Sequence, residues 1–176
     1  MTPNELLEQC YIAKCNTRGD IHEHMPTLRK YATGCDHVTE MGVRYAVSTY
    51  AFLAAMPKRF VCYDIVPAQA ITDALELGSK NGIDCTFHLE DTTKAVIEPT
   101  DLLFIDTLHV YAQLSAELTL HAGKVSKWII LHDTWTFGLR GSDGGEGLWK
   151  AVTELEGWKV REKFDNNHGL TVLERC

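Results

Sequence analysis

The chain has 176 residues, of which 45% are hydrophobic and 23% charged, and its formal net charge is −7. This length suits a single domain with its own core, and the composition excludes a disordered, collagen-like or coiled-coil chain. An acidic surface repels phosphate backbones and anionic headgroups, so we expect neither a nucleic acid nor a membrane as a partner.

The sequence also predicts a compartment. No apolar run approaches the roughly 20 residues of a membrane span. The first residues, Met1–Glu5, lack the basic and apolar blocks of a secretory signal. The six cysteines form no Cys-x-x-Cys pair, and Cys62 and Cys85 lie in apolar runs, where a thiol usually behaves as a small hydrophobe. We therefore expect a reduced, cytoplasmic protein.

The beginning of the chain predicts two helices. In the first, Thr2 is placed to cap the helix, Pro3 suits its first turn, and Glu5 completes a capping box. The second helix is expected to begin after Asp20 and to end before Gly34, because its apolar residues recur at helical spacing between these points.

Short apolar strands then alternate with helices, which indicates a parallel sheet with right-handed crossovers. The strands are expected at His37–Met41, Phe60–Asp64, Cys85–Leu89, Asp101–Asp106 and Lys127–His132. The helices are expected at Val47–Met56, Ala68–Asn81, Val110–Ala122 and Gly147–Leu155. We treat residues 1–176 as one domain, in which a helical cap (1–35) precedes an α/β core (36–176).

The end of the chain departs from this alternation. Trp158–Phe164 and Leu170–Glu174 read as two strands, joined by residues 165–169, whose Asn and Gly residues tolerate positive φ. A parallel sheet that finishes in an antiparallel hairpin differs from the plain dinucleotide-binding pattern.

The first predicted strand leads into a candidate binding loop, because ligands of open α/β sheets bind at the carboxyl ends of the strands. The loop follows Glu40 and contains Gly42, which would let the backbone approach a ligand closely. The helix that begins near Ser48 would offer unpaired N–H groups to an anion. The loop lacks the Gly-x-Gly-x-x-Gly spacing, which argues against a nicotinamide or flavin cofactor.

Acidic residues follow the next two strands. Asp64 ends the second strand and is placed to accept hydrogen bonds from ribose hydroxyls, with a helix-capping role as the alternative. Glu90 and Asp91 follow the third strand and are placed to reach the edge of an adenine, with solvated loop acids as an equal alternative.

The fourth and fifth strands each end in a carboxylate with a histidine nearby. Asp106, His132 and Asp133 are candidate ligands for Mg²⁺ or Mn²⁺, with water completing the shell. His109 would project over the same cleft as a general base, with a pKa suited to accepting a proton near neutral pH. In the alternative interpretation, Asp106 caps the next helix and the histidines only form hydrogen bonds within a polar cleft.

A glycine-rich segment, Gly138–Gly147, follows the fifth strand and is interpreted as a flap beside the site or as a plain connector. Trp135, Phe137 and Trp149 flank it, and either line a substrate pocket or belong to the core. The segment does not end in Gly-Lys-Ser/Thr and is therefore no phosphate-binding loop.

With these residues in place, the chain resembles class I S-adenosylmethionine-dependent methyltransferases, and within them the small branch near the cephalosporin-hydroxylase-like and macrolide-sugar O-methyltransferases. The matching segments are Glu40–Thr49, Tyr63–Asp64, Leu103–Tyr111, Ile130–Thr134 and Asn167–Glu174. The resemblance implies a Rossmann-like three-layer fold with a mostly parallel, seven-stranded sheet that ends in an antiparallel hairpin, preceded by two N-terminal helices.

The resemblance also implies S-adenosylmethionine as the cofactor. Glu40 and Gly42 would contact its methionine part, Asp64 its ribose, and Glu90 and Asp91 would lie near its adenine. The residues assigned to cofactor binding on this basis are Glu40, Gly42, Arg44, Ser48, Asp64, Glu90, Asp91 and Asp106. The loop departs from the family in lacking the usual second glycine, near whose place Ala46 stands.

Metal-dependent relatives carry an Asp-x-x-His after the fourth strand, with the Asp on the metal and the His as base, and Asp106 and His109 fit that pattern. The acidic pair that follows their fifth strand falls on His132 and Asp133, so a histidine replaces an acid here. The expected activity is therefore Mg²⁺-assisted (or Mn²⁺-assisted) O-methylation of a small hydroxylated, sugar-like acceptor, with Asp106 and His109 as the catalytic residues.

Two other functions stay open at this level. The same fold could serve as a cofactor-binding scaffold without catalysis, since the chain is short for an enzyme with its own substrate lid. The Asp/His cluster could also serve a metal-dependent hydrolase. A homodimer formed through the first two helices would supply a missing wall of the site.

Overall fold

A seven-stranded sheet, in the order β3-β2-β1-β4-β5-β7-β6, forms the centre of the protein. The computed structural model describes residues 1–176. The strands are β1 (His37–Met41), β2 (Arg59–Asp64), β3 (Asp84–Leu89), β4 (Thr100–Ile105), β5 (Val125–His132), β6 (Trp158–Phe164) and β7 (Leu170–Arg175). Strands β1 to β5 pair in parallel, and β7 lies antiparallel between β5 and β6. The predicted Rossmann-like sheet with its closing hairpin is confirmed.

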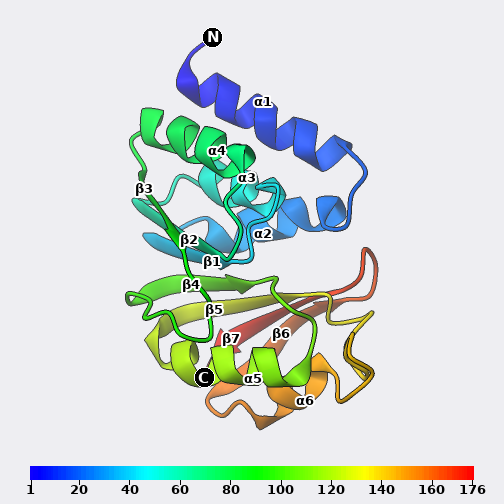
Figure 1. Cartoon of the computed structure of the whole chain (residues 1–176). Coiled ribbons are helices and arrows are strands. Elements are labelled where there is room, and N and C mark those ends of the chain that lie inside the picture. Colours follow the sequence, from blue (N-terminus) through cyan, green and yellow to red (C-terminus); the bar gives the residue numbers. More distant parts are fainter.

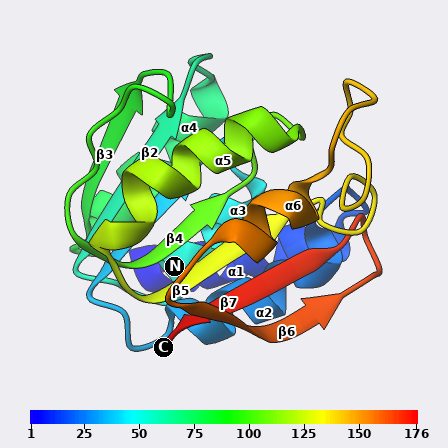
Figure 2. The same ribbon diagram turned by 90° about the horizontal axis from the view of Figure 1, so that it is seen from below.

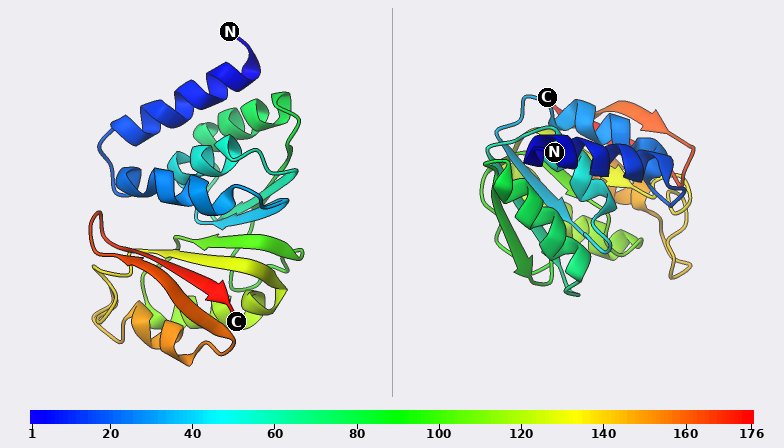
Figure 3. Two further views of the ribbon diagram at one scale, coloured as in Figure 1. Left: turned by 180° about the vertical axis from the view of Figure 1, so that it is seen from behind. Right: turned by 90° about the horizontal axis from the view of Figure 1, so that it is seen from above.

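Helices cover both faces of the sheet (Figures 1 and 3). The helices are α1 (Pro3–Asn16), α2 (Met25–Ala32), α3 (Val47–Ala54), α4 (Gln69–Lys80), α5 (Tyr111–His121) and α6 (Leu148–Glu154), with 3₁₀ turns η1 (His22–His24) and η2 (Ala122–Lys124). Helices α2, α3 and α4 lie on one face, with α1 outside them, and α5 and α6 lie on the other. No helix combines the length and the apolar character that a membrane span requires.

Strand β4 shows why both faces need cover. Leu102 and Phe104 pack into the core on the α2–α4 side, whereas Leu103 and Ile105 pack into the core on the α5–α6 side. Side chains alternate along a strand, so an unbroken apolar run places hydrophobic residues on both faces. The layers therefore follow directly from the apolar run.

The N-terminal segment agrees with its prediction at one end and differs at the other. Thr2 and Glu5 form the capping box, with the amide of Glu5 donating to Thr2 Oγ1 at 3.2 Å. The second helix, expected directly after Asp20, begins only at Met25, after the 3₁₀ turn His22–His24. Pro26 explains the delay, because proline fits the first turn of an α-helix and disrupts its interior.

The strand ends decide where functional side chains can lie. Strand β4 ends at Ile105, one residue earlier than predicted, so Asp106 lies just outside the sheet. The β5–α6 connection, residues 133–147, extends from the same edge of the molecule (Figure 2). Residues from several separate connections are therefore gathered at the carboxyl edge of the sheet.

Candidate active site

Two adjoining cavities open at the carboxyl ends of the parallel strands. The first has a volume of about 610 Å³ and lies between residues 19–21, the β1–α3 loop and the ends of β4 and β5. The second has a volume of about 500 Å³ and lies between the ends of β2, β3 and β4 and the beginning of α5. The residues that line both cavities are Gly42, Arg44, Asp106 and Thr107. A ligand bound along this edge can therefore occupy both cavities at once.

The β1–α3 loop separates the two cavities and has an unusual backbone. Gly42 has φ +83°, and a Cβ there would lie 2.0 Å from the carbonyl oxygen of Asp106. Arg44 (φ 51°) and Ala46 (φ 56°) also have positive φ, although neither is glycine. Such backbone is held in place by its surroundings. Asp64 provides part of that hold, because its Oδ2 accepts the amides of Val43 and Arg44, each at 2.8 Å.

Glu40, predicted to contact the cofactor, is fully buried and lines neither cavity. Its carboxylate accepts hydrogen bonds from the hydroxyls of Ser48 and Thr49. Burial raises the pKa of Glu40 to about 8, and these hydroxyls only partly oppose the shift. Glu40 therefore orders the start of α3 beneath the loop, while Ser48 itself lines the first cavity.

Asp64, the predicted ribose ligand, lines the second cavity. Besides the two loop amides at Oδ2, its Oδ1 accepts the amide of Val66 at 2.9 Å. A carboxylate has about four acceptor positions, so the one that remains lies on Oδ1. Ile65, which follows Asp64 in the chain and is 72% exposed, also lines this cavity. Leu108, 59% exposed, is a second apolar residue of the lining.

Glu90 and Asp91 line the same cavity, as their predicted proximity to an adenine requires. The two residues differ in availability. Asp91 is engaged in its own turn, where it accepts hydrogen bonds from the Lys94 ammonium and from the amide and hydroxyl of Thr93. These bonds, with that of Lys94 first, lower the pKa of Asp91 to about 2. The side chain of Glu90 is exposed and makes no hydrogen bond within the protein.

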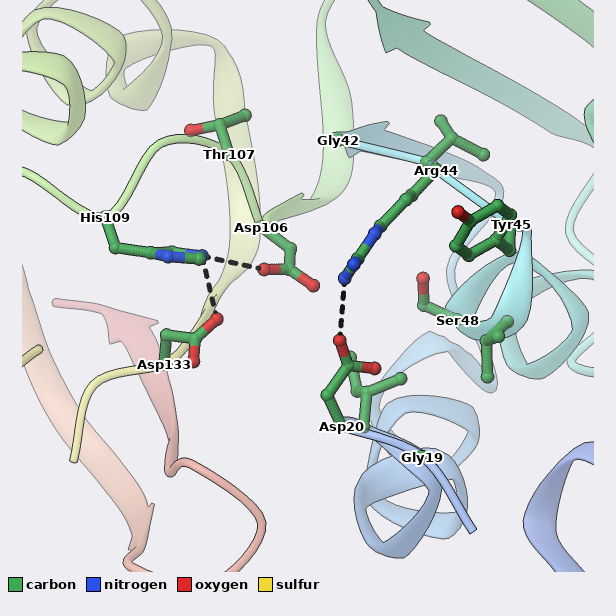
Figure 4. A pocket seen from close by; sticks show the side chains of 13 residues that line it. Gly19, Asp20, Gly42, Arg44, Tyr45, Ser48, Asp106, Thr107, His109 and Asp133 are labelled. Carbon is green, nitrogen blue, oxygen red and sulfur yellow. Dashed lines mark hydrogen bonds and ion pairs between the residues drawn. The ribbon is translucent and has the colours of Figure 1, made fainter. Parts of the chain in front are cut away.

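Asp106, His109 and Asp133 converge on one point of the first cavity (Figure 4). His109 Nε2 lies 2.8 Å from Asp133 Oδ2 and 3.6 Å from Asp106 Oδ1. One ligand atom from each of the three residues lies within 4.8 Å of the others. Asp133 has φ 61°, so the chain turns sharply after β5 and brings this carboxylate to the cavity.

His132 differs from its prediction as a metal ligand. Its side chain is 1% exposed, its Nε2 lies 3.1 Å from the carbonyl oxygen of Asn167, and it does not line the first cavity. Its Nδ1 lies 3.3 Å from Asp106 Oδ2 and 3.1 Å from Asp133 Oδ2, behind the carboxylates. As the last residue of β5, it is enclosed by the protein, and His109 takes its place in the group that could hold a cation.

The pKa of His109 is higher than the near-neutral value predicted for it, because of the charges in this cluster. Burial by itself lowers the pKa of a histidine, but Asp106 and Asp133 outweigh burial and raise the pKa of His109 to about 9. The same carboxylates raise the pKa of His132 to about 10. In return the histidines lower the pKa of both aspartates, against the effect of burial. With no cation bound, His109 is therefore an imidazolium at neutral pH and holds its proton against Asp133.

The aromatic residues around the glycine-rich segment line neither cavity. Phe137 stacks on His109, with ring centroids 4.7 Å apart and planes 8° apart, and so fixes the plane of the imidazole. Trp149 packs against the core on the α5–α6 side, and Trp135 is largely exposed. The segment also reaches His109 through its backbone, since the amide of Ser142 donates to the His109 carbonyl at 2.9 Å.

The structure adds residues that sequence reasoning missed. Asp20, from the connection before η1, lines the first cavity, and its Oδ2 pairs with Arg44 Nη1 at 2.9 Å (Figure 4). Ile65 and Leu108 carry a weak sequence signal, since they are apolar residues one and two positions after predicted strand ends. Nothing in the local sequence marks Asp20, because tertiary packing alone brings it to the cavity.

No protein-family model matches this chain, and no curated protein matches its sequence. Solved structures share its fold. The N-methyltransferase NodS from Bradyrhizobium japonicum WM9, in complex with S-adenosyl-L-homocysteine, is 14% identical, with a TM-score of 0.68 over 99% of each chain. An O-methyltransferase from Bacillus cereus, also with S-adenosylhomocysteine, is 13% identical, with a TM-score of 0.66 over 99% of this chain and 90% of that one.

The O-methyltransferase TomG from Streptomyces achromogenes, which is involved in tomaymycin synthesis and was solved with S-adenosylmethionine, is 13% identical. Its TM-score is 0.62, over 88% of this chain and 80% of TomG. These similar structures are S-adenosylmethionine-dependent methyltransferases, and the chain has their Rossmann-like fold.

Proposed function

We propose that the protein is an S-adenosylmethionine-dependent methyltransferase that modifies a hydroxyl group of a small, sugar-like acceptor. The observation that carries the proposal is the pair of adjoining cavities at the carboxyl ends of β1, β2 and β4, which share Gly42 and Asp106. One cavity has the features of a nucleoside site, and the other has a cluster of acid–base groups. The S-adenosylmethionine or S-adenosylhomocysteine in the similar structures supports the same cofactor here.

The nucleoside is assigned to the second cavity. Its lining combines the carboxylate of Asp64, whose remaining acceptor position on Oδ1 suits one ribose hydroxyl, with the exposed apolar side chains of Ile65 and Leu108, suited to the faces of a base. The methionine part would cross the loop at Gly42, where the missing Cβ allows close backbone approach. Its carboxylate would then meet Arg44, the cationic side chain shared by both cavities.

The acidic cluster suits a hard divalent cation. Asp106 and Asp133 offer carboxylate oxygens to the first cavity, and the buried His132 Nδ1 lies behind both. Oxygen ligands are those preferred by Mg²⁺ and Mn²⁺. We assign the cation to Asp106 and Asp133, with water as further ligands. When bound, it would lower the pKa of an acceptor hydroxyl.

His109 is assigned to the acceptor's proton. Its Nε2 can serve as a third cation ligand or exchange a proton, but one nitrogen does not do both at once. A cation on Asp106 and Asp133 would offset the charges that raise the pKa of His109, so that a neutral imidazole would take up the proton. Phe137 holds the plane of the ring. S-adenosylmethionine, when bound, would supply the methyl group: its carbon–sulfur bond would break as the acceptor oxygen bonds to the methyl carbon, and S-adenosylhomocysteine would be left. The main role of the two cavities would be to hold the acceptor oxygen, the methyl carbon and the sulfur in one line.

Calorimetric titration with S-adenosylhomocysteine, in Mg²⁺ and then in EDTA, tests the cofactor. Micromolar binding that Asp64→Ala weakens at least tenfold supports the proposal. Asp36→Asn, at the opposite edge of the sheet beside β1, serves as the matched control. Absence of binding in both buffers overturns the proposal, and metal-dependent ester hydrolysis without S-adenosylmethionine would then favour a hydrolase.

Turnover of a hydroxylated acceptor by His109→Ala separates the two possible roles of His109. Loss of turnover with unchanged Mg²⁺ affinity supports the base. Loss of Mg²⁺ affinity instead makes His109 a ligand and contradicts its assignment to the proton.

A further inference from the structure

A buried acid outside the proposed chemistry organises the wall of the second cavity. Glu117, on α5, is 0% exposed. Its carboxylate accepts hydrogen bonds from Thr92 Oγ1, from Thr107 Oγ1 at 2.9 Å and from Gln113 Nε2 at 2.9 Å. All three donors line the second cavity. Every hydrogen bond of this buried side chain therefore goes to the lining of one site.

The network fixes the orientation of the Gln113 side chain. Gln113 Nε2 donates to Glu117 Oε1 and also lies 3.3 Å from Thr92 Oγ1. The opposite orientation would place the amide oxygen against the carboxylate, where two acceptors repel each other. The nitrogen end of the carboxamide therefore faces Glu117, and the oxygen end faces away from the network without a hydrogen bond from the protein.

Thr92 is held by two residues of α5. Its hydroxyl donates to Glu117, and its carbonyl oxygen lies 2.8 Å from Nε2 of the buried His121, one helical turn beyond Glu117. Helix α5 thus ties the connection after β3 to the connection after β4. A hydrogen-bond acceptor fixed on such a support is suited to discriminate between ligands.

The other acceptors of this cavity are less well placed. Asp91 is occupied by Thr93 and Lys94, and Glu90 is exposed to water. The oxygen of Gln113 belongs to a half-buried residue that lines the same cavity as the apolar Leu108. A hydrogen bond in a partly desolvated position contributes more to selectivity than one in water.

We infer that Gln113 Oε1 accepts a hydrogen bond from the amino group of the base bound in the second cavity, and that Glu117 is the positioning residue that presents this oxygen. The inference rests on the proposed function, which places a nucleoside there. Adenine carries an exocyclic amino group, a donor. Hypoxanthine carries a carbonyl oxygen at the same position and would set one acceptor against another. The site therefore selects S-adenosyl over S-inosyl compounds.

The test compares the Kd of S-adenosylhomocysteine with that of S-inosylhomocysteine by calorimetry. The wild-type protein is expected to prefer the adenosyl compound by roughly tenfold or more, the effect of one lost hydrogen bond with an acceptor left unpaired. Gln113→Leu is expected to reduce the preference to below about threefold, and Gln9→Leu, an exposed glutamine of α1, is expected to preserve it. A preference unchanged in Gln113→Leu overturns the inference.

Glu117→Gln tests the positioning role in a variant of nearly the same shape. The new amide can pair with Gln113 in either orientation, so the preference is expected to fall at least threefold. A purely structural role would weaken both ligands equally and leave the ratio unchanged, which would contradict the role of Glu117. If neither compound binds the wild-type protein, the proposed function fails; if both bind without discrimination, only the present inference fails.

Discussion

The guanidinium of Arg44 lies 2.9 Å from the carboxylate of Asp20, and this ion pair joins the N-terminal segment to the β1–α3 loop across the first cavity (Figure 4). Both side chains are largely exposed, so the pair adds little to stability. Arg44 has positive φ, and its position at the boundary of both cavities suits it to bind an anionic group of a ligand. The carboxylate of Asp20 would then compete with that of the ligand.

Removal of this competition is expected to strengthen binding. Asp20→Asn should lower the Kd of S-adenosylhomocysteine about two- to fivefold, because Arg44 no longer has a charged partner in the protein. Arg44→Ala should raise the Kd. Methylthioadenosine, which lacks the amino-acid part, should bind equally to all three proteins in calorimetry. Equal effects on both ligands would show that Arg44 does not recognise the carboxylate.

Asp133→Asn is expected to remove the cation site. The variant retains the shape of the side chain but loses one of the two carboxylates assigned to Mg²⁺, so Mg²⁺ affinity should fall at least tenfold. Isothermal titration with MgCl₂ measures this change. Asp143→Asn, on the exposed turn of the β5–α6 connection, is the matched control. Equal Mg²⁺ binding by wild type and Asp133→Asn would argue that the cation, if it binds, binds elsewhere.

Gly42→Ala is expected to destabilise the protein by more than about 2 kcal/mol, because it adds a collision with the Asp106 carbonyl to the cost of positive φ. Gly82→Ala supplies the control: Gly82 has φ +82°, but a Cβ there meets nothing within 4 Å. That variant should lose only about 1 kcal/mol. Urea unfolding measures both. Equal losses would mean that the close approach to Asp106 contributes nothing.

The buried Glu40 predicts a pH dependence of stability. Its pKa is raised to about 8 in the folded protein, so the folded state binds the proton more tightly than the unfolded chain, whose carboxyl has a pKa of 4.5. The contribution is therefore complete below pH 4.5 and is lost as the pH rises through 8. Between these values the free energy of unfolding should fall by a few kcal/mol.

Glu40→Gln removes this titration and should flatten the dependence. Urea unfolding at pH 5.5 and pH 8.5 compares the two proteins, with the exposed Glu76→Gln as control. A slope that persists unchanged in Glu40→Gln would assign the effect to another group.

Much of the fold could be predicted because its signals are local. Strand β1 has the predicted bounds, and the strand pair at the end of the chain begins at the predicted Trp158 and Leu170. Apolar runs, capping residues and turn residues act over a few positions, and the order of strands and helices then restricts the topology. The differences lie at element ends, as with α2, where Pro26 shifts the start.

The candidate site was predictable only as a set of strand ends. That Asp64, Asp106 and Asp133 would share one edge follows from parallel strands. Which histidine faces the cavity does not follow, since His109 and His132 both lie beside carboxylates in the sequence. The direction of each side chain depends on where β5 ends and on the turn at Asp133 (φ 61°).

The sequence alone determined the layered α/β architecture and the edge of the sheet at which chemistry can occur, because periodicity and strand order are encoded in neighbouring residues. Tertiary structure alone decided that Asp20 meets Arg44, that His109 is held as an imidazolium between Asp106 and Asp133, and that Glu117 meets Thr92 and Thr107. The first and last of these depend on where separate connections pack, and the charge of His109 depends on burial among two carboxylates. Distances and dielectric surroundings of this kind arise only when the chain has folded.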